Sequence, residues 1–296
     1  MTKSSKLVFF GTETFSLPSL KALIGAGYDI AAIVTKPDSR RGRGKKPFIH
    51  PIKQFGIDHH IPVWQPEKVG DIEADLVKLK PTAAILVAYG KIIPTRILNV
   101  FEPVGIINLH PSALPRYRGP SPIEAAIING DSTTAVSIMK LDAGMDTGPI
   151  YGQKSVTLSG HETKPALSER LAQVGAAYLL ELLPAIISGD LKASPQQISD
   201  VSVTSLISKA DGQLDPLTDD AYVLERKVRA YQGYPKAHLI INGIDVIITS
   251  AKVTSQPDTN QLNVPCAKKT YLLVKELVAP SGRTMSGEDF VRGYLR

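Results

Sequence analysis

The residues best suited to chemistry stand at the end of a short apolar stretch, 105–110. In an extended strand alternate side chains share a face, so Asn108 and His110 point the same way. A carboxamide beside an imidazole suits stabilisation of a developing oxyanion together with proton transfer. The alternative is a strand-end histidine that only caps the loop backbone. Pro111 and Pro115 give the loop that follows a stiff, extended path.

A carboxylate partner for the histidine must come from another part of the chain. The glycine-rich loop 141–149 joins two predicted strands and contains Asp142 and Asp146. Either carboxylate would fix the imidazole tautomer and support its charged form if it lay beside His110. For each aspartate, the alternative is a turn in which the carboxylate accepts a hydrogen bond from its own backbone.

Metal chemistry has little support in the sequence. His59 and His60 are adjacent, so they do not share a helix face, and no carboxylate or cysteine spacing accompanies them. Cys266 is the one cysteine, which excludes an intramolecular disulfide and a cysteine-cluster metal site. We therefore expect no metal.

Strands that alternate with helices must position these groups. Strand patterns at 6–10, 29–35, 82–88 and 105–110 alternate with helical patterns such as 15–25 and predict a Rossmann-like, doubly wound, mostly parallel α/β sheet. Ligands of such sheets bind outside the carboxyl ends of the strands, where the 108–110 pair stands. A nucleotide cofactor is disfavoured, because the first strand is followed by a single glycine and no G-x-G-x-x-G or Walker pattern occurs.

The pattern changes near residue 190. We predict a catalytic domain over 1–189, a linker over 190–207 and a smaller β-rich, OB-like barrel domain over 208–296. In the last of these, the Asn242-Gly243 pair predicts a hairpin turn, because both residues tolerate positive φ. A five-stranded barrel fits the remaining strand patterns.

The composition is that of a globular protein. The chain has 296 residues, of which 43% are hydrophobic and 21% charged, so disorder is excluded and about two domains are expected. No apolar run approaches the roughly 20 residues of a membrane span, and the N-terminus has neither a signal-peptide nor a transit-peptide pattern. These features predict a cytoplasmic protein without a transmembrane helix.

The net charge of +6 is concentrated in one segment. Residues 36–47 hold six cationic side chains opposed only by Asp38, and their glycines and prolines predict a loop. One interpretation is that the loop neutralises the phosphates of a nucleic acid. The other is a solvated surface loop, because short basic runs are common.

The motifs together resemble a known family. Residues 108–119 resemble the signature of formyltransferases that use 10-formyltetrahydrofolate, and 142–148 are similar to the loop that carries the catalytic aspartate of that family. Within that superfamily, residues 9–12, 42–46, 87–90 and 209–215 make the chain most similar to methionyl-tRNA formyltransferases. The resemblance implies a one-carbon transferase that moves the formyl group of 10-formyltetrahydrofolate to the free α-amine of methionine on initiator tRNA, for translation initiation.

The resemblance also implies roles for individual residues. The catalytic trio would be Asn108, His110 and Asp146. The folate would be bordered by Ser112, Ala113, Leu114, Pro115, Leu86, Val87, Ala88, Tyr89, Asp142 and Gly144. The tRNA would meet the cationic residues Arg40, Arg41, Arg43, Lys45 and Lys46. We expect a monomer with no membrane partner.

Two alternatives stay open. One is a formyltransferase that acts on a small amine, such as an amino sugar nucleotide or a purine precursor. A purine enzyme would end near the close of the first domain, so residues 208–296 argue against it. The other is a non-catalytic protein that binds tRNA or senses folate. Binding of tRNA should weaken steeply with salt, whereas binding of a small amine should change much less.

Overall fold

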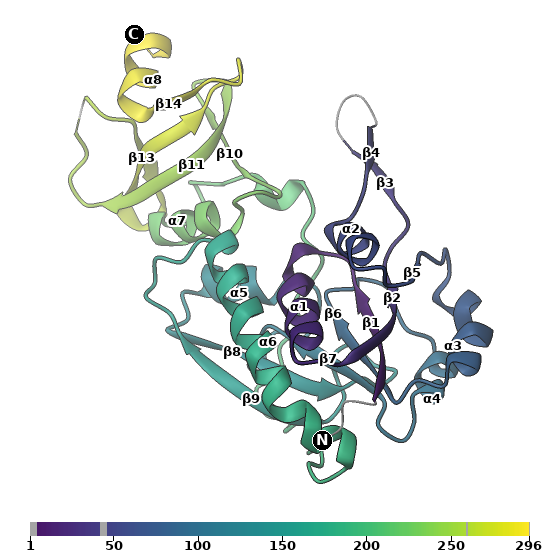
Figure 1. Cartoon of the computed structure of the whole chain (residues 1–296). Coiled ribbons are helices and arrows are strands. Elements are labelled where there is room, and N and C mark those ends of the chain that lie inside the picture. The colour runs from purple at the N-terminus through teal and green to yellow at the C-terminus, as the bar shows by residue number, and fades with distance from the viewer. Residues whose placement is uncertain (1–4, 42–45, 259, 296) are drawn as a thin grey trace. The chain divides into compact units, whose positions relative to one another are not determined.

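The chain folds into two compact units (Figure 1). The computed structural model describes residues 5–41, 46–258 and 260–295. The first unit takes in residues 1–120, 134–156 and 168–203, and the second takes in residues 121–133, 157–167 and 204–296. The domain boundaries expected above, after residues 189 and 207, follow from the sequence pattern alone and remain a prediction.

The helices and strands of the described residues have the following bounds. The helices are α1 (Leu17–Gly25), α2 (Pro51–Asp58), α3 (Glu73–Leu79), α4 (Thr95–Val100), α5 (Pro122–Asn129), α6 (Lys164–Ser188), α7 (Ala221–Ala230) and α8 (Gly287–Tyr294). The first strands are β1 (Lys6–Gly11), β2 (Asp29–Val34), β3 (Ser39–Arg41), β4 (Lys46–Phe48), β5 (Val63–Trp64), β6 (Ala83–Val87) and β7 (Ile106–His110). The later strands are β8 (Thr133–Lys140), β9 (Ile150–Thr157), β10 (Ala237–Ile241), β11 (Ile244–Thr254), β12 (Asn263–Cys266), β13 (Thr270–Val278) and β14 (Thr284–Ser286).

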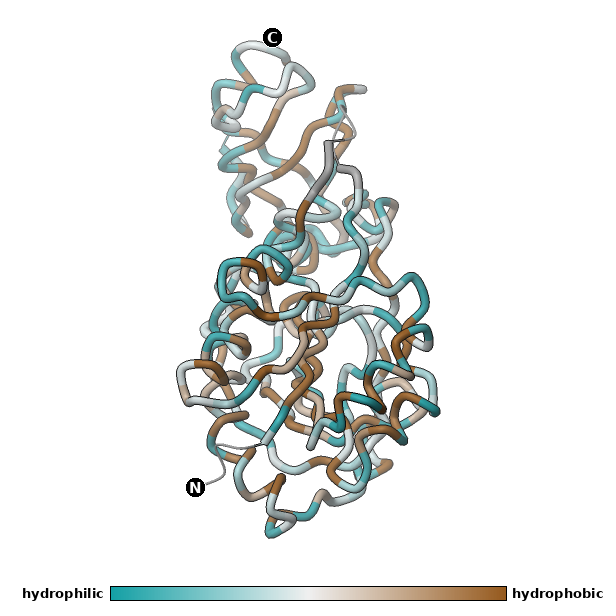
Figure 2. The backbone as a smooth tube through the Cα atoms, turned by 45° about the vertical axis from the view of Figure 1, so that its right-hand side comes forward, coloured by the Kyte–Doolittle hydropathy of each residue, from teal (hydrophilic) through white to brown (hydrophobic). Residues whose placement is uncertain are grey.

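The first unit is built on a seven-stranded sheet with the order β5-β2-β1-β6-β7-β8-β9. The pairs from β5 to β7 are parallel, and β8 joins β7 antiparallel. The middle strands are almost wholly buried, and Figure 2 shows hydrophobic backbone running through the centre of this unit. The predicted Rossmann-like, mostly parallel sheet is confirmed.

The longest helix, α6, covers part of this sheet. Its side chains Leu179, Leu183 and Ile186 are buried in one core with strand residues of β1, β6 and β7. By length and composition alone α6 would suffice to cross a membrane. The prediction that no segment meets this test is therefore wrong. A helix that packs on a sheet is rich in apolar residues for the same reason that a spanning helix is.

A close approach between α6 and β7 fixes the strand that carries the candidate residues. A Cβ atom on Gly175 of α6 would stand 2.6 Å from Cδ1 of Leu109. A glycine at this position therefore lets the helix lie directly on Leu109, which is 2% exposed. Because Leu109 lies between Asn108 and His110 on the strand, its side chain points to the opposite face. The helix α6 thus packs on the face of β7 opposite to Asn108 and His110.

The second unit is organised around a five-stranded antiparallel sheet, β10-β11-β13-β12, with β14 paired to β13. Its core includes Leu224 and Val228 of α7 and Phe290 of α8, all buried. Asn242 and Gly243, with φ of 47° and 81°, form the turn between β10 and β11. The predicted hairpin and the β-rich second fold are confirmed.

Several short elements escape the sequence prediction. The segment 36–47, expected as a loop, contributes β3 and pairs it antiparallel with β4, with Ser39 opposite Phe48. The loop prediction is wrong there, because paired strands let the chain turn back while its backbone groups bond each other. The short helices α2, α3 and α5 and the strands β12 and β14 were not predicted either.

Candidate active site

Asn108 occupies a central position on β7. Its backbone lies in register with Leu86 of β6 and Met139 of β8, so the strand is paired on both sides (Figure 1). The residue is only 5% exposed, and its carboxamide makes no hydrogen bond to any residue within 5–41, 46–258 and 260–295. An amide with no bond inside the protein to break is available to a ligand.

The two ring nitrogens of His110 have different surroundings. Nε2 lies 2.9 Å from the carbonyl oxygen of Tyr117. Because a carbonyl only accepts, Nε2 must carry a proton. Nδ1 lies 3.6 Å from Oδ2 of Asp146, which is longer than a hydrogen bond. Nδ1 is therefore the nitrogen that remains available to give or take a proton.

Asp146 reaches the histidine from the loop between β8 and β9. Its Oδ2 accepts a 2.7 Å hydrogen bond from the backbone N–H of Gly119, and its backbone has φ of 53°. A non-glycine residue in this left-handed region carries strain that its surroundings must compensate. The strained turn directs the carboxylate toward the imidazole, with the side chain 16% exposed.

The other aspartate of the loop does something different. Oδ1 of Asp142 accepts hydrogen bonds from the backbone N–H of Gly144, at 3.1 Å, and from Oγ1 of Thr147, at 2.8 Å. This is the turn geometry named above as the alternative for either residue. The sequence offers two aspartates as partners for His110. Asp146 is the one that faces the histidine, whereas Asp142 hydrogen-bonds within its own loop. Gly144 lies exposed in the same turn.

The segment after β7 is clamped by two polar residues from neighbouring strands. Oγ of Ser137, on β8, donates to the carbonyl of Ser112 at 2.6 Å and accepts from the N–H of Leu114 at 3.3 Å. Nε2 of Gln153, on β9, donates to the carbonyl of Leu114 at 2.8 Å. Ala113 and Pro115 are half-buried in this clamped segment. Ser137 and Gln153 were missed from the sequence, although a serine within a buried apolar strand is a usable signal.

The end of β6 lies next to β7. Leu86 is half-buried where the other residues of β6 are buried, and Val87 ends the strand. Ala88 follows with φ of 47°, and the carbonyl of Tyr89 accepts from Oγ1 of Thr12 at 3.1 Å. The phenol of Tyr89 is buried and has no hydrogen-bond partner among the described residues, and burial raises its pKa to about 12. The residues predicted from the two strand ends thus lie on adjacent strands.

Comparison with known proteins decides the family. The model of the formyl transferase family matches residues 5–183, and the model of the formyl transferase C-terminal domain matches residues 206–295. The methionyl-tRNA formyltransferase of Methylococcus capsulatus is 38% identical over 301 residues, which cover 98% of this chain and 97% of that protein. The chain belongs to the formyl transferase family, among the methionyl-tRNA formyltransferases.

Solved structures agree on the fold. The N-formyltransferase from Helicobacter canadensis, in complex with folinic acid and dTDP-3-aminofucose, aligns with a TM-score of 0.70 at 18% identity, over 91% of this chain and 98% of that chain. HypX from Aquifex aeolicus, in complex with tetrahydrofolic acid, aligns with a TM-score of 0.67 at 14% identity, over 98% of this chain. This chain spans 47% of that protein.

In this formyl transferase the basic segment is only partly described. Arg43 and Lys45 lie outside the described residues, and so do the side chains of Arg40, Arg41 and Lys46. Asp38 is engaged by residues outside the segment: hydrogen bonds from Lys53 and Gln65 hold the pKa of its carboxyl below the usual value. The one acidic side chain of the segment is therefore already engaged.

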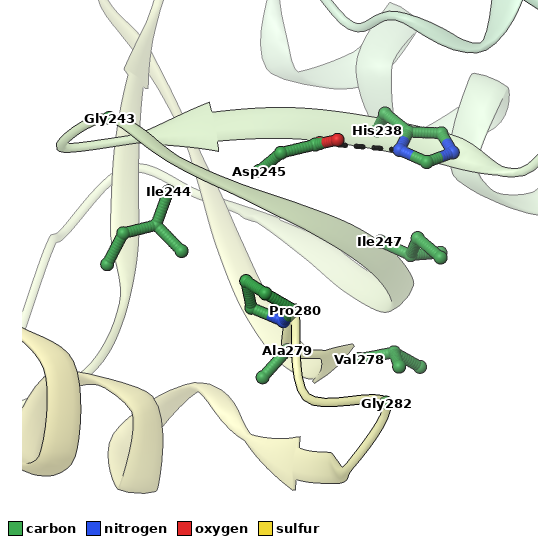
Figure 3. Close-up of a pocket in the computed structure, with 9 residues that line it drawn as sticks. All are labelled: His238, Gly243, Ile244, Asp245, Ile247, Val278, Ala279, Pro280 and Gly282. Atoms are coloured by element: carbon green, nitrogen blue, oxygen red, sulfur yellow. Dashed lines mark hydrogen bonds and ion pairs between the residues drawn. The ribbon is translucent and has the colours of Figure 1, made fainter.

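A hollow of about 590 Å³ lies in the second unit of the formyl transferase (Figure 3). His238 and Asp245 line it, with Nδ1 of the histidine 3.3 Å from Oδ1 of the aspartate, together with apolar side chains such as Ile247 and Pro280. It contains none of the residues predicted for catalysis, folate or tRNA.

His59, one of the two adjacent histidines considered above for a metal, contacts Phe55 of α2. Nδ1 of His59 bonds the carbonyl of Phe55 at 2.9 Å, and its ring stacks on the Phe55 ring. In the part of the formyl transferase that the structure describes, no three His, Cys, Asp or Glu side chains gather closely enough to hold a metal ion.

Proposed function

We propose that the chain transfers the formyl group of 10-formyltetrahydrofolate to the free α-amine of methionine on initiator tRNA, giving formylmethionyl-tRNA for translation initiation. The observation that carries the proposal is the carboxamide of Asn108, which makes no hydrogen bond within the described residues and shares a strand face with a histidine held beside Asp146. The name of the curated relative supports the acceptor, and the folates named for the similar structures support the co-substrate. We place the reaction in the cytoplasm, carried out by a monomer.

The residues present fit a folate. Leu86 offers partly exposed apolar surface in register with Asn108, and the segment 112–115 is held rigid by Ser137 and Gln153. An apolar wall beside a few fixed polar groups is what a flat, polar-edged ring system requires. When bound, 10-formyltetrahydrofolate supplies the formyl group from N10 and accepts a proton there.

Asn108 stabilises the charge that develops during transfer. The α-amine must be neutral to attack the formyl carbon, which is accessible at neutral pH because α-amino pKa values lie near 8. As the new C–N bond forms, the formyl oxygen becomes negative. The Asn108 NH₂ group donates to this oxygen, and because the amide makes no hydrogen bond within the described residues, no internal bond has to break first.

His110 and Asp146 assist the transfer of the proton that the attacking amine loses. Because the Tyr117 carbonyl holds the Nε2 proton, Nδ1 is the nitrogen that faces the reacting groups and Asp146. Protonated at Nδ1, the imidazole adds a second donor for the oxyanion, and the adjacent carboxylate stabilises its charge. Asp146 also assists removal of the proton that the attacking amine loses, which must reach N10 before the old C–N bond breaks.

The acceptor is tested directly. The purified protein is incubated with 10-formyltetrahydrofolate and, in parallel, with Met-charged initiator tRNA, free methionine, an amino sugar nucleotide or a purine-precursor amine. We expect formyl transfer to the charged tRNA alone. Transfer only to a small amine would replace the tRNA proposal with the sugar- or purine-type alternative. No transfer to any acceptor would contradict the enzymatic function.

Salt dependence tests the role of the basic segment. We expect the logarithm of the tRNA binding constant to fall linearly with the logarithm of salt concentration, and Arg43→Ala to make that slope shallower by about 1. Lys78→Ala, which removes an equal charge from an exposed position on α3, is the matched control and should leave the slope unchanged. Equal slopes for both variants and the wild type would remove Arg43 from the interface.

A further inference from the structure

A segment that the sequence predicts as a linker passes beside the candidate site. After α6 ends, residues 194–203, here the return segment, pair with parts of the first unit at both ends. Ser194 and Ile150 exchange backbone hydrogen bonds of 2.8 and 2.9 Å. Val203 forms a parallel bridge with Arg118. The return segment is therefore packed structure rather than a free connection.

Gln196, in this segment, ties together the two loops that meet at His110. Its Nε2 donates to the carbonyl of Asp146 at 2.7 Å and to the carbonyl of Gly148 at 2.8 Å. Its Oε1 accepts from Nε and Nη2 of Arg118, at 3.1 and 2.7 Å. One carboxamide thus joins the loop after β7 to the loop after β8, using both of its donors.

Ser202 holds the other partner of the histidine. Its Oγ accepts from the N–H of Tyr117 at 2.8 Å, and its carbonyl accepts from the N–H of Arg118 at 2.9 Å. Tyr117 is the residue whose carbonyl oxygen receives the Nε2 proton of His110. Both ring nitrogens of His110 therefore face groups that the return segment fixes in place.

We propose that Gln196 is a positioning residue for formyl transfer, which sets the Asp146 carboxylate against Nδ1 of His110. The inference rests on the proposed function. Asp146 has a left-handed backbone, and within the described residues its carboxylate accepts one hydrogen bond, from the N–H of Gly119. Without the two bonds from Gln196, the strained turn is free to relax, and relaxation moves the carboxylate away from the imidazole.

The first test compares Gln196→Ala with Gln197→Ala. Gln197 is the neighbouring residue, is exposed and makes no side-chain hydrogen bond within the described residues, so the control removes the same group at the adjacent position. We expect Gln196→Ala to lower kcat about 10- to 100-fold with KM for folate and tRNA changed less than about twofold. The control should keep wild-type values. Equal kcat values for both variants would overturn the proposal.

A second variant guards against misfolding. Gln196→Glu keeps the side-chain length and the acceptor for Arg118, but it cannot donate to the carbonyls of Asp146 and Gly148. Where circular dichroism shows a wild-type fold, the loss of kcat should match that of Gln196→Ala. Wild-type kcat in a folded Gln196→Glu protein would show that the two donated bonds do not position Asp146.

A double-mutant cycle separates positioning from general structural support. In an Asp146→Asn background, Gln196→Ala should lower kcat less than twofold further, because the group it positions is already gone. Additive losses would overturn the proposal.

A last measurement does not depend on activity. The NMR signals of the His110 ring should shift in Gln196→Ala and stay in place in Gln197→Ala. If the wild type transfers no formyl group but these signals behave as expected, the proposed function fails and the positioning contact stands. Unshifted signals in Gln196→Ala overturn the positioning inference by themselves.

Discussion

The two units use polar side chains in contrasting ways. Around His110 in the first unit, polar groups are buried, and their partners lie far away in the sequence, as with Gly119 and Asp146. In the second unit, some ion pairs include strongly exposed side chains: Arg292 and Glu288 are each 54% exposed, and Lys268, which pairs with Asp220, is 78% exposed. Exposed pairs contribute little to stability. Polar substitutions around His110 should therefore change chemistry, and those at the exposed pairs of the second unit should change stability slightly.

The largest effect tests the chemical side of this contrast. Asn108→Ala should lower kcat about 10²- to 10³-fold, because one donor to the developing oxyanion is lost. His110→Ala and Asp146→Ala should lose at least as much. Steady-state formyl transfer measures the loss, and thermal unfolding shows whether the fold persists. His161→Ala, at an exposed position, is the control. Near-normal turnover in all three site variants would show that these side chains do not carry the chemistry, and would contradict the proposed contrast between the two units.

An intermediate effect tests the support behind β7. Gly175→Ala should destabilise the protein by about 1–3 kcal/mol, because the new methyl group has to displace the buried Leu109 side chain. It should also lower kcat, since β7 carries the two candidate residues. Gly25→Ala, on α1 with no atom within 4 Å of the new Cβ, should stabilise slightly. Urea unfolding of both variants measures the difference. If Gly175→Ala unfolds like the wild type, the close approach does not support the strand.

The smallest effect belongs to the second unit. Asp220 caps α7 through a bond from the N–H of Val223, and Lys268 bonds its other oxygen. The Lys268 and Val223 bonds hold the pKa of the Asp220 carboxyl below its usual value. Asp220→Ala should cost about 1 kcal/mol of unfolding free energy and leave kcat unchanged.

The pH dependence of the same cap follows from the sign of its shift. Because the folded-state pKa is lowered, the folded form binds this proton less readily than the unfolded chain. Its contribution is present above about pH 4, the usual carboxyl value, and is lost as pH falls through the folded-state pKa. Asp220→Asn keeps a capping side chain but should flatten this part of the stability curve. An unchanged curve, measured by urea unfolding between pH 2 and 6, would contradict the assignment.

The sequence predicts those strands and helices whose apolar residues form a continuous or periodic pattern. The strands β1 and β6 are continuous apolar runs, and they lie where the patterns at 6–10 and 82–88 place them. The short helices α2 and α5 were missed because two turns hold too few apolar repeats to detect. Each begins at a proline, Pro51 and Pro122, a start signal that was available.

The candidate site is predictable only where its residues are neighbours. Asn108 and His110 lie two positions apart on one strand, so alternation alone places them together. The choice between Asp142 and Asp146 depends on the fold of a turn, which local composition leaves open. Gln196 bonds a carbonyl 50 positions away, and no local pattern encodes such a contact, so its segment was interpreted as a linker.

The return segment has a consequence for exchanging parts between related proteins. Consider a chimera that joins a foreign C-terminal half immediately after α6, near residue 190. It replaces both Gln196 and Ser202, so the loops after β7 and β8 lose the hydrogen bonds that these two residues make to them. A chimera joined after Val203 keeps Gln196 and Ser202 in the same parent sequence as the catalytic half, so these hydrogen bonds are preserved. The first design should impair turnover even when its foreign half binds tRNA normally, and the second should not.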